Sequence, residues 1–388
     1  MQKNILFLIN SLEMGGAEKA TINLAEKLQP NKNSHIYFVI LKNKTQVPLK
    51  ENFSYHFFSQ KQNPSFLYSI LQVPFLAYKL IKYCRKHDID TIFAVLSKAQ
   101  FVAVLSKFLG NKSQIICSEH TVLSKWQNKQ LLYPFLQKIS IGFSYRNADK
   151  VHCVSESIAR DLEQNFQISP AKISVIPNII DFRHISTAQN EAINFDFPPK
   201  TLRLISVGSL KTIKNQSLTL RALAQVSNKN FTLLILGDGP DRKMLEKLCE
   251  ELQLSDKVHF LGNQANPFPY LKAADIFLLS SFLEGLPNVI IEALLCRCAV
   301  LATDCESGPR EILAPESPPE MRLKEGFEIV PYGILSAVND INAYVNALET
   351  LFDNPQLMCE FQEKATNCVQ AFSPEKIIQQ YRQLFEME

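Results

Sequence analysis

Two glutamates with seven residues between them, Glu284 and Glu292, are the strongest candidates for chemistry in this chain. An apolar run at 276–279 predicts a strand before them, Gly285 permits a tight turn, and Pro287 suits the first position of a helix. Backbone N–H groups at such a helix start favour an anion. The order carboxylate, anion cradle, carboxylate matches a sugar–diphosphate–ribose ligand, although solvated glutamates at a helix start are the plainer alternative.

Glycines and lysines follow two other expected strands. Gly15 and Gly16 come after the first strand, where they let the backbone approach a ligand at the start of the next helix. They do not form a GxGxxG pattern, so a nicotinamide cofactor is not indicated. Gly208 turns the chain after the first strand of the second half, and Lys211 and Lys214 precede a helix. The two lysines can neutralise a diphosphate without a metal, or form a solvated basic loop.

Further strand-to-helix loops carry weaker signals. His120 follows an expected strand at 114–117 and can reach a ligand, but a lone histidine is often structural. The turn at 237–240 is explained as a plain turn in which Pro240 opens a helix. The rigid aromatic loop at 266–270 can flank a base or serve packing. The segment 304–325 is rich in Pro and Glu and is expected to be a surface loop without derivable chemistry.

Composition excludes several protein classes. The 388 residues suggest two or three domains, and no stretch approaches 18 uninterrupted apolar residues, so no membrane-spanning helix is expected. The N-terminal apolar run is too short for a signal peptide and predicts a first strand. Nine cysteines without a metal-ligand or disulfide pattern indicate buried thiols in a reducing compartment, and no metal site is expected.

Charge divides the chain into a basic and an acidic half. Residues 1–180 hold 22 Lys and Arg against 11 Asp and Glu, whereas residues 181–388 hold 19 against 27. Two basic, aromatic segments, Phe66 to His87 and Lys125 to Lys150, are amphipathic and favour contact with an anionic membrane surface. Core-facing helices with basic outer faces are the alternative. Nucleic acid is not an expected partner, because no recognisable binding module is present.

Alternating strands and helices predict an α/β fold with two doubly wound parallel sheets joined by a polar linker at 183–200. Strands are expected near 4–10, 35–41, 91–95, 114–118, 150–154 and 173–176, and after the linker near 202–207, 231–236, 257–260, 275–279 and 298–302. Helices are expected near 17–29, 66–87, 98–109, 130–147 and 156–165, and then near 215–227, 240–253, 287–295, 339–352, 355–371 and 374–386.

On these motifs the chain resembles a retaining glycosyltransferase of the GT-B fold in glycosyltransferase family 4. The resemblance covers nearly the whole chain and is most specific from Asp275 to Leu294. It implies two Rossmann-like domains facing across a cleft, with an acceptor-binding domain at 1–182 and a nucleotide-sugar-binding domain at 201–370. It also implies a C-terminal helix at 371–388 that returns to the first domain.

By the same resemblance, the catalytic residues are Glu284, His120 and Lys214. Glu284 and His120 contact the transferred sugar, and Lys214 stabilises the departing nucleotide. The implied donor-binding residues are Gly15, Gly16, Gly208, Ser209, Lys211, Gly285, Leu286, Pro287, Asn288 and Glu292. No metal and no other cofactor is implied, because the lysine and the helix start supply positive charge. Ser209 departs from the family, which usually has Arg immediately after the loop glycine.

The resemblance predicts transfer of a hexose or N-acetylhexosamine from a nucleotide-sugar, with a UDP-sugar preferred, onto a lipid-linked saccharide in surface-polysaccharide biosynthesis. The enzyme would be cytoplasmic and peripheral on the inner face of the plasma membrane. Two alternatives stay open: a UDP-sugar 2-epimerase on the same fold, and a non-catalytic nucleotide-sugar-binding protein.

Overall fold

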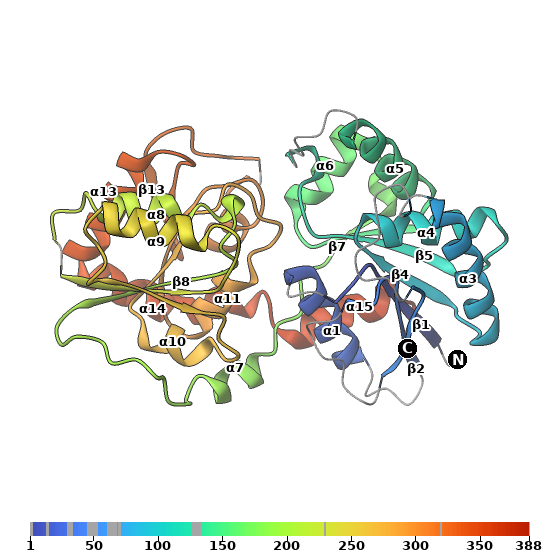
Figure 1. Ribbon diagram of the computed structural model, residues 1–388, viewed down its shortest axis with the longest axis horizontal. Coiled ribbons are helices and arrows are strands. Elements are labelled where there is room, and N and C mark those ends of the chain that lie inside the picture. The colour runs from blue at the N-terminus through green and yellow to red at the C-terminus, as the bar shows by residue number, and fades with distance from the viewer. Residues whose placement is uncertain are drawn as a thin grey trace. The chain divides into compact units, whose positions relative to one another are not determined.

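The chain folds into two α/β units in the computed structural model (Figure 1). Unit 1 comprises Met1–Ile179 and Pro374–Glu388, and unit 2 comprises Ile180–Ser373. The structure describes residues 3–12, 15–28, 34–44, 53–59, 68, 71–125, 133–228, 230–318 and 320–387. The boundaries expected from sequence were residues 182 and 370, each within a few residues of these.

Unit 1 is built on one parallel sheet of seven strands in the order β3-β2-β1-β4-β5-β6-β7. The strands are β1 (Lys3–Ile9), β2 (Ser34–Ile40), β3 (Ser54–Phe57), β4 (Thr91–Val95), β5 (Gln114–Glu119), β6 (Lys150–Cys153) and β7 (Ile173–Val175). The helices are α1 (Gly16–Leu28), α3 (Val73–Lys86), α4 (Ser97–Phe108), α5 (Tyr133–Asn147), α6 (Glu156–Phe166) and α15 (Pro374–Leu384). Strand order reverses between β1 and β4, where open sheets of this kind bind ligands.

The last helix completes the core of unit 1. Tyr381 and Phe385 are buried among the strand residues Phe7 and Phe93, with ring centroids 5.4 Å apart for Phe93 and Phe385. Helix α15 packs beside α1, although some 350 residues separate the two along the chain (Figure 1). The segment after residue 373 is therefore an integral part of unit 1.

Unit 2 holds a second seven-stranded sheet in the order β10-β9-β8-β11-β12-β14-β13, parallel except at β13. Its strands are β8 (Leu202–Val207), β9 (Phe231–Leu236), β10 (Val258–Gly262), β11 (Ile276–Leu279), β12 (Ala299–Thr303), β13 (Phe327–Val330) and β14 (Gly333–Ser336). Its helices are α7 (Phe182–Ala188), α8 (Gln216–Leu223), α9 (Arg242–Glu251), α10 (Phe268–Ala273), α11 (Asn288–Leu295), α12 (Pro309–Leu313), α13 (Ile341–Asp353) and α14 (Pro355–Gln370). Order reverses between β8 and β11.

The doubly wound α/β prediction is confirmed, with local corrections. The linker at 183–200 contains α7, which Asp181 begins by accepting a hydrogen bond from the backbone of His184. The aromatic loop at 266–270 enters helix α10, and its Tyr270 is buried. Short strands with little sequence signal, β3, β13 and β14, were not predicted.

Of the two basic segments, Lys125 to Lys150 fits the core-facing alternative where it is described. Tyr145 is completely buried, whereas Phe143 is half-buried and stacks on the exposed ring of Phe108, with ring centroids 5.4 Å apart. Trp126 and Lys129, which belong to the predicted membrane-contacting segment, lie outside the described residues, as do the side chains of 133–139. In the other basic segment, Phe75 and Tyr78 of α3 are exposed.

Candidate active site

The loops after β8 and β11 meet where the strand order of unit 2 reverses, and an ion pair joins them. Lys214 Nζ lies 2.6 Å from Oε1 and 2.8 Å from Oε2 of Glu284. The glutamate is 8% exposed, and its Oε1 also accepts a hydrogen bond of 2.6 Å from the Ser281 hydroxyl. The structure therefore brings together the two side chains of unit 2 that the sequence analysis assigned to catalysis.

Backbone contacts hold these two loops in register. The Phe282 N–H donates to Ile213 O at 2.9 Å, and the Ser280 hydroxyl donates to Lys214 O at 3.1 Å. From the next strand, the buried Thr303 hydroxyl donates to Ser281 O at 2.6 Å. Because both partners of the ion pair sit on hydrogen-bonded backbone, their geometry is fixed before any ligand arrives.

The turn into α11 places a helix N-terminus beside Glu284. Helix α11 begins at Asn288, and its N-cap residue, Pro287, makes no side-chain capping hydrogen bond. Gly308, with φ +92°, packs so tightly that a Cβ there would lie 2.2 Å from Pro287 Cδ, so only glycine fits. The hydroxyl of Ser307 donates to Gly285 O. The turn is thus held from the neighbouring β12 loop.

Leu286 lies just before helix α11, and Glu292 lies within it. Leu286 is 9% exposed and packs with the core, whereas Glu292 is half-buried on α11, four residues beyond Asn288. At 1.5 Å per residue this places Glu292 roughly 6 Å along the helix from its start. Glu284 thus precedes the helix N-terminus and Glu292 follows it within α11, which is the order that the sequence suggested.

Glycines let the loop after β8 pack against the turn after β9. A Cβ at Gly237 would lie 1.9 Å from Gly208 O, and one at Gly239 would lie 2.2 Å from Leu210 O. Backbone hydrogen bonds also link the loops, with Leu210 N donating to Asp238 O at 3.0 Å. The glycines at 237 and 239 are therefore explained by packing, as their plainer interpretation held.

The other two predicted residues of the β8 loop lie at its surface. Ser209 is half-buried and its carbonyl accepts a hydrogen bond of 3.2 Å from Gln216 Nε2. Lys211 is exposed and its backbone N–H donates to Ser209 O at 3.0 Å. The loop thus offers a mobile ammonium group rather than the planar guanidinium usual in the family that the chain resembles.

In unit 1 the predicted residues follow β1 and β5, two strands separated in the sheet by β4. Gly15 precedes α1, and a Cβ there would lie 2.1 Å from Glu18 Oε2, while a Cβ at Gly16 would meet open space. His120 follows β5 with its Nε2 3.0 Å from the Ser118 hydroxyl. Burial lowers the pKa of His120 to about 3, so the ring is neutral at physiological pH.

Glu119, which the sequence analysis did not single out, is a buried carboxyl next to His120. Its Oε1 accepts hydrogen bonds from the backbone N–H groups of His120 at 2.8 Å and Thr121 at 3.0 Å, and Tyr145 Oη lies 2.5 Å from Oε2. Burial raises the pKa of Glu119 to about 7, against the opposing effect of the Tyr145 hydrogen bond. An acidic residue at a strand end, beside a histidine, was the one available signal.

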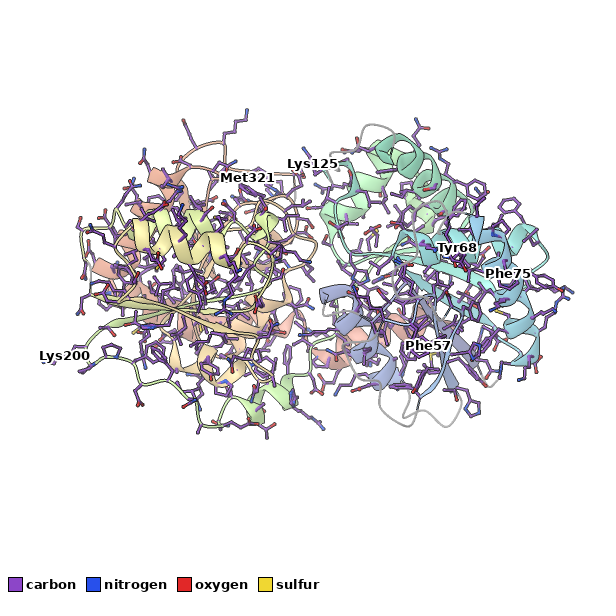
Figure 2. The ribbon with its side chains drawn as sticks, in the orientation of Figure 1. Phe57, Tyr68, Phe75, Lys125, Lys200 and Met321 are labelled. Carbon is purple, nitrogen blue, oxygen red and sulfur yellow. The ribbon has the colours of Figure 1, made fainter. Side chains whose placement is uncertain are left out.

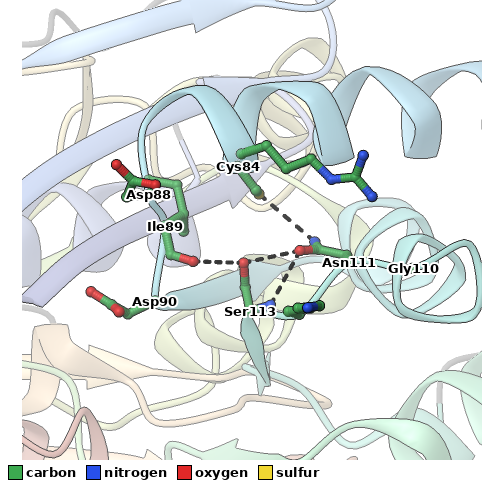
Figure 3. A pocket seen from close by; sticks show the side chains of 9 residues that line it. Cys84, Asp88, Ile89, Asp90, Gly110, Asn111 and Ser113 are labelled. Carbon is green, nitrogen blue, oxygen red and sulfur yellow. Dashed lines mark hydrogen bonds between the residues drawn. The ribbon is translucent and has the colours of Figure 1, made fainter.

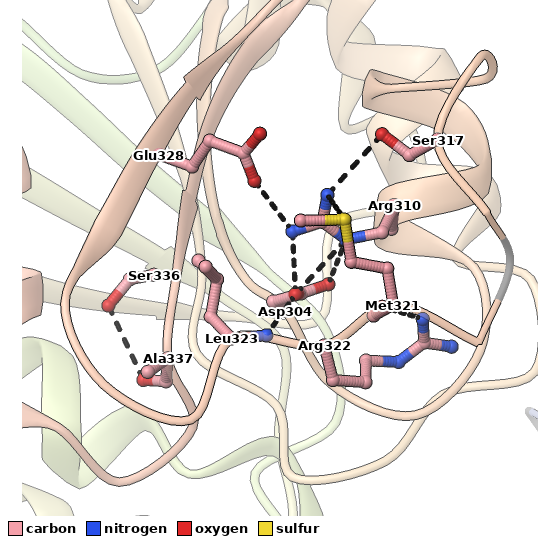
Figure 4. Close-up of polar contacts among 9 residues, drawn as sticks. All are labelled: Asp304, Arg310, Ser317, Met321, Arg322, Leu323, Glu328, Ser336 and Ala337. Atoms are coloured by element: carbon pink, nitrogen blue, oxygen red, sulfur yellow. Dashed lines mark hydrogen bonds and ion pairs between the residues drawn. The ribbon is translucent and has the colours of Figure 1, made fainter.

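The segment 304–325 is anchored in the interior of unit 2, which corrects its expected place as a plain surface loop (Figure 4). Arg310 and Asp304 are 1% and 0% exposed, and Arg310 Nη2 lies 2.8 Å from Asp304 Oδ2 and 2.9 Å from Glu328 Oε2. Asp304 also accepts from Leu323 N at 2.7 Å. This pair ties the β12 loop, which holds Gly308, to β13.

A cavity of about 360 Å³ lies at the opposite, amino-terminal edge of the unit 1 sheet (Figure 3). Ser113 donates to Ile89 O at 2.7 Å and to Asn111 Oδ1 at 3.0 Å, and Asn111 Nδ2 donates to Ser106 Oγ at 3.0 Å. These side chains satisfy one another and stabilise the turns before β4 and β5. The cavity is therefore not a candidate for the predicted chemistry.

Among the residues that the structure describes, no three His, Cys, Asp or Glu side chains cluster in a way that could hold a metal ion. No described helix is both long enough and apolar enough to cross a membrane.

Similarity to known proteins follows the division of the chain. Residues 14–184 match the model of Glycosyltransferase Family 4, and residues 189–368 match that of Glycosyl transferases group 1. One relative, the N-acetylgalactosamine-N,N'-diacetylbacillosaminyl-diphospho-undecaprenol 4-alpha-N-acetylgalactosaminyltransferase of Campylobacter jejuni, is 32% identical, with 97% of each chain covered. Another, the UDP-Gal:alpha-D-GlcNAc-diphosphoundecaprenol alpha-1,3-galactosyltransferase of Escherichia coli, is 25% identical over 79% of this chain and 77% of that protein.

Solved structures share the fold. Anabaena HepE in complex with UDP superposes with a TM-score of 0.75 at 20% identity, with all of both chains covered. Sucrose-phosphate synthase from Thermosynechococcus elongatus gives a TM-score of 0.81 at 19% identity, with 99% and 98% covered. The predicted family and the GT-B architecture of two Rossmann-like units are thereby confirmed. Because two glycosyltransferase models and a full-length relative account for both of its units, the chain is a hexosyltransferase belonging to glycosyltransferase family 4.

Proposed function

We propose that this transferase moves a hexose or N-acetylhexosamine from a UDP-sugar, with retention, onto a lipid-linked saccharide in surface-polysaccharide synthesis. The observation that carries the proposal is the Lys214–Glu284 pair beside the N-terminus of α11. The names of the C. jejuni and E. coli relatives describe alpha-linked transfer to diphospho-undecaprenol acceptors, and UDP occupies HepE. Both support this choice of donor and acceptor.

We assign the leaving diphosphate to Lys214 and the N-terminus of α11. The Lys214 ammonium group has three N–H donors. Two of them are hydrogen-bonded to the carboxylate of Glu284, so the third can bind a phosphate oxygen. We assign Glu284, which Lys214 and Ser281 hold, to accept hydrogen bonds from hydroxyls of the transferred sugar. Glu292 is assigned to the ribose. Positive groups aimed at the developing negative charge stabilise the transition state most where they are preorganised.

His120, Gly15 and Gly16 are assigned to the sugar, the acceptor and the diphosphate from unit 1. His120 is neutral and rigidly held, so its role is to orient a hydroxyl rather than to carry charge. Gly16 leaves open space where any side chain would stand. These assignments require no metal ion, since the charge on the leaving group is met by the lysine and the helix.

The decisive experiment is transfer of radiolabelled sugar from UDP-glucose, UDP-galactose and their N-acetyl forms onto undecaprenyl-diphosphate saccharides. We expect UDP release only when the acceptor is present, and undiminished rates in EDTA. An epimerase would convert the UDP-sugar without acceptor, and a non-catalytic binder would show UDP-dependent thermal stabilisation without turnover. Loss of activity in EDTA that Mg²⁺ restores would overturn the metal-independent form of the proposal.

We also propose that the enzyme works at the cytoplasmic face of the plasma membrane, held there by helix α3. One face of α3 packs into unit 1 through Leu76, Leu80 and Cys84. The opposite face exposes Tyr78, which is 52% exposed, and Phe75, which is 58% exposed and is labelled in Figure 2. Leu71 and Tyr68, which precede the helix, are 69% and 40% exposed. A helix with a second apolar face that packs on nothing described is typical of interfacial binding.

The basic side chains on the exposed face of α3 favour an anionic lipid surface as its partner. Lys79 Nζ lies 4.9 Å from the Phe75 ring centre, and Lys82 Nζ lies 4.6 Å from that of Tyr78. Arg85 and Lys86 follow in the last turn. Aromatic rings can enter the headgroup region while the ammonium groups meet lipid phosphates.

Sedimentation with vesicles of phosphatidylglycerol and phosphatidylcholine tests the membrane proposal. Phe75→Ser with Tyr78→Ser should reduce vesicle binding at least tenfold, and Lys82→Gln should make binding less sensitive to salt. Met244→Ser, which removes an equally exposed apolar side chain from α9 in unit 2, serves as the control. Equal binding by all variants would contradict the assignment to α3.

A further inference from the structure

A buried chain of polar side chains leads from His120 to the last helix of unit 1. Ser118 Oγ lies 3.0 Å from His120 Nε2 and 2.8 Å from His152 Nδ1. The other nitrogen of His152, Nε2, lies 2.8 Å from Ile176 O and 3.0 Å from the hydroxyl of Tyr381 on α15. Ser118, His152 and Tyr381 are all 2% exposed or less, so water does not compete for these contacts.

The positions of the protons in this series of hydrogen bonds follow from the carbonyl group at its end, Ile176 O. The Ile176 carbonyl only accepts, so His152 must carry its proton on Nε2. Burial lowers the pKa of His152 to about 4, so this ring is neutral at pH 7 and its Nδ1 is an acceptor. The single hydroxyl proton of Ser118 then points to His152 Nδ1.

The assignment then reaches His120. Since the Ser118 proton is used, the contact between Ser118 Oγ and His120 Nε2 requires the proton of His120 to be on Nε2. A neutral His120 consequently presents Nδ1 as a hydrogen-bond acceptor. The Glu119 carboxyl group meanwhile accepts a hydrogen bond from the backbone N–H of His120. Both the ring and the backbone of the residue are thus fixed from the interior of unit 1.

We propose that Ser118 and His152 are positioning residues that lock His120 in the Nε2–H tautomer, so that Nδ1 accepts a hydrogen bond from a hydroxyl of the sugar. This proposal rests on the proposed function for the identity of the hydroxyl, but the tautomer is a property of the free protein. Tyr381 connects His152 to α15 through its hydroxyl group, so this helix takes part in holding His152.

The tautomer is tested by nitrogen NMR of the full-length protein labelled with ¹⁵N-histidine, without substrate. The chain has seven histidines, and the His120 signals are identified by their loss in His120→Gln. We expect a protonated Nε2 and an unprotonated Nδ1 that stay unchanged from pH 8 to pH 5. A protonated Nδ1, or a charged ring at pH 7, would overturn the proposal whatever the enzymatic activity.

Kinetics test the positioning role. Ser118→Ala removes the bond that selects the tautomer, and loss of one buried hydrogen bond of about 1 kcal/mol corresponds to roughly fivefold. We expect kcat to fall by that factor or more, the donor KM to change less than twofold, and the NMR spectrum to show both tautomers of His120. Ser144→Ala, which deletes a buried hydroxyl bonded to Ser140 O in its own helix, is the matched control and should leave kcat unchanged.

The two readouts separate failure of this proposal from failure of the proposed function. If the protein shows no transferase activity, the NMR spectrum still decides the tautomer. If the tautomer is as assigned but Ser118→Ala retains full kcat, His120 is not positioned for catalysis through Ser118 and the proposal is wrong. A circular dichroism melt of Ser118→Ala close to that of Ser144→Ala establishes that both variants are folded.

Discussion

Lys214 contacts both carboxylate oxygens of Glu284, at 2.6 and 2.8 Å, and so closes the junction between the β8 and β11 loops of unit 2. Family resemblance assigned these residues separate tasks, one on the phosphate and one on the sugar. In the structure each is the main partner of the other. A change at Lys214 will therefore act on the donor directly and through Glu284.

Replacing Lys214 by Met should reduce both activity and stability. Without the ammonium group, the carboxylate of Glu284 stays largely buried with only Ser281 as a described partner, which we expect to cost about 1–3 kcal/mol in the free energy of unfolding. Loss of a charge contact in the transition state should lower kcat by about 10²–10³. Urea unfolding and initial rates measure the two effects.

Two further variants show whether the effects on stability and activity are separable. Lys214→Arg keeps the charge and should regain most of the stability. Lys214→Met combined with Glu284→Gln removes both charges, and should recover stability without activity. If the double variant is as unstable as the single one, the ion pair is not the source of the cost.

Ser209→Arg should improve use of the donor. The position is half-buried at the loop that follows β8, and a guanidinium there can bind phosphate oxygens in a bidentate manner. A charge-assisted hydrogen bond of about 1.5 kcal/mol corresponds to a donor KM roughly tenfold lower. Ser209→Met, of comparable length but uncharged, is the control. An unchanged or higher KM in Ser209→Arg would mean that Lys211 already fills this role.

Glu119 should make the stability of the protein fall as pH rises from 4.5 to 7. Its pKa is raised by burial from 4.5 to about 7, so the native state holds a proton that the unfolded chain has released. Unfolding in this range therefore releases a proton, and the free energy of unfolding drops by up to about 3 kcal/mol.

Glu119→Gln isolates that contribution. The difference in free energy of unfolding between wild type and this variant should change by up to about 3 kcal/mol from pH 4.5 to 7. Effects of pH on other groups are common to both proteins and cancel in this difference. The two buried histidines act in the opposite sense, because their lowered pKa values make acid destabilising. A difference that does not change with pH would contradict the raised pKa of Glu119.

Arg310→Met should destabilise unit 2 by about 3–5 kcal/mol, because it leaves the carboxylate of Asp304 buried without its cation. The double variant with Asp304→Leu removes both charges and should be less destabilised than the single variant. Thermal unfolding followed by calorimetry compares the three proteins. Equal losses in the single and double variants would indicate that packing, rather than charge, is what Arg310 provides.

The main elements of the fold were predictable because their signals are local. Buried parallel strands such as 231–236 and 276–279 are short, continuous apolar runs, and the strand ranges expected from sequence agree with the structure to within two residues. Strand β3 carries only partly apolar residues at a sheet edge, and β13 is half exposed. Their pairing depends on neighbours distant in sequence, so no local pattern announces them.

The candidate site was predictable in its residue types but not in its contacts. Glu284, Lys214 and His120 each follow a strand, which places them at a ligand-binding edge. That Lys214 would pair with Glu284, or that Ser118 would connect His120 to His152, depends on side chains from separate strands meeting in space. Buried partners such as Glu119 and Tyr145 resemble ordinary polar residues in sequence, because burial is a property of the folded chain.

The place of α15 has a consequence for how the protein is made. Tyr381 and Phe385 belong to the core of unit 1, yet they follow the whole of unit 2 along the chain. Unit 2 is complete in the nascent chain once residue 373 has left the ribosome, whereas unit 1, although its synthesis starts first, lacks part of its core until α15 has also been made. Domains usually fold in their order of synthesis. Between these two units the order of completion is reversed, because unit 1, which carries His120, is completed after unit 2.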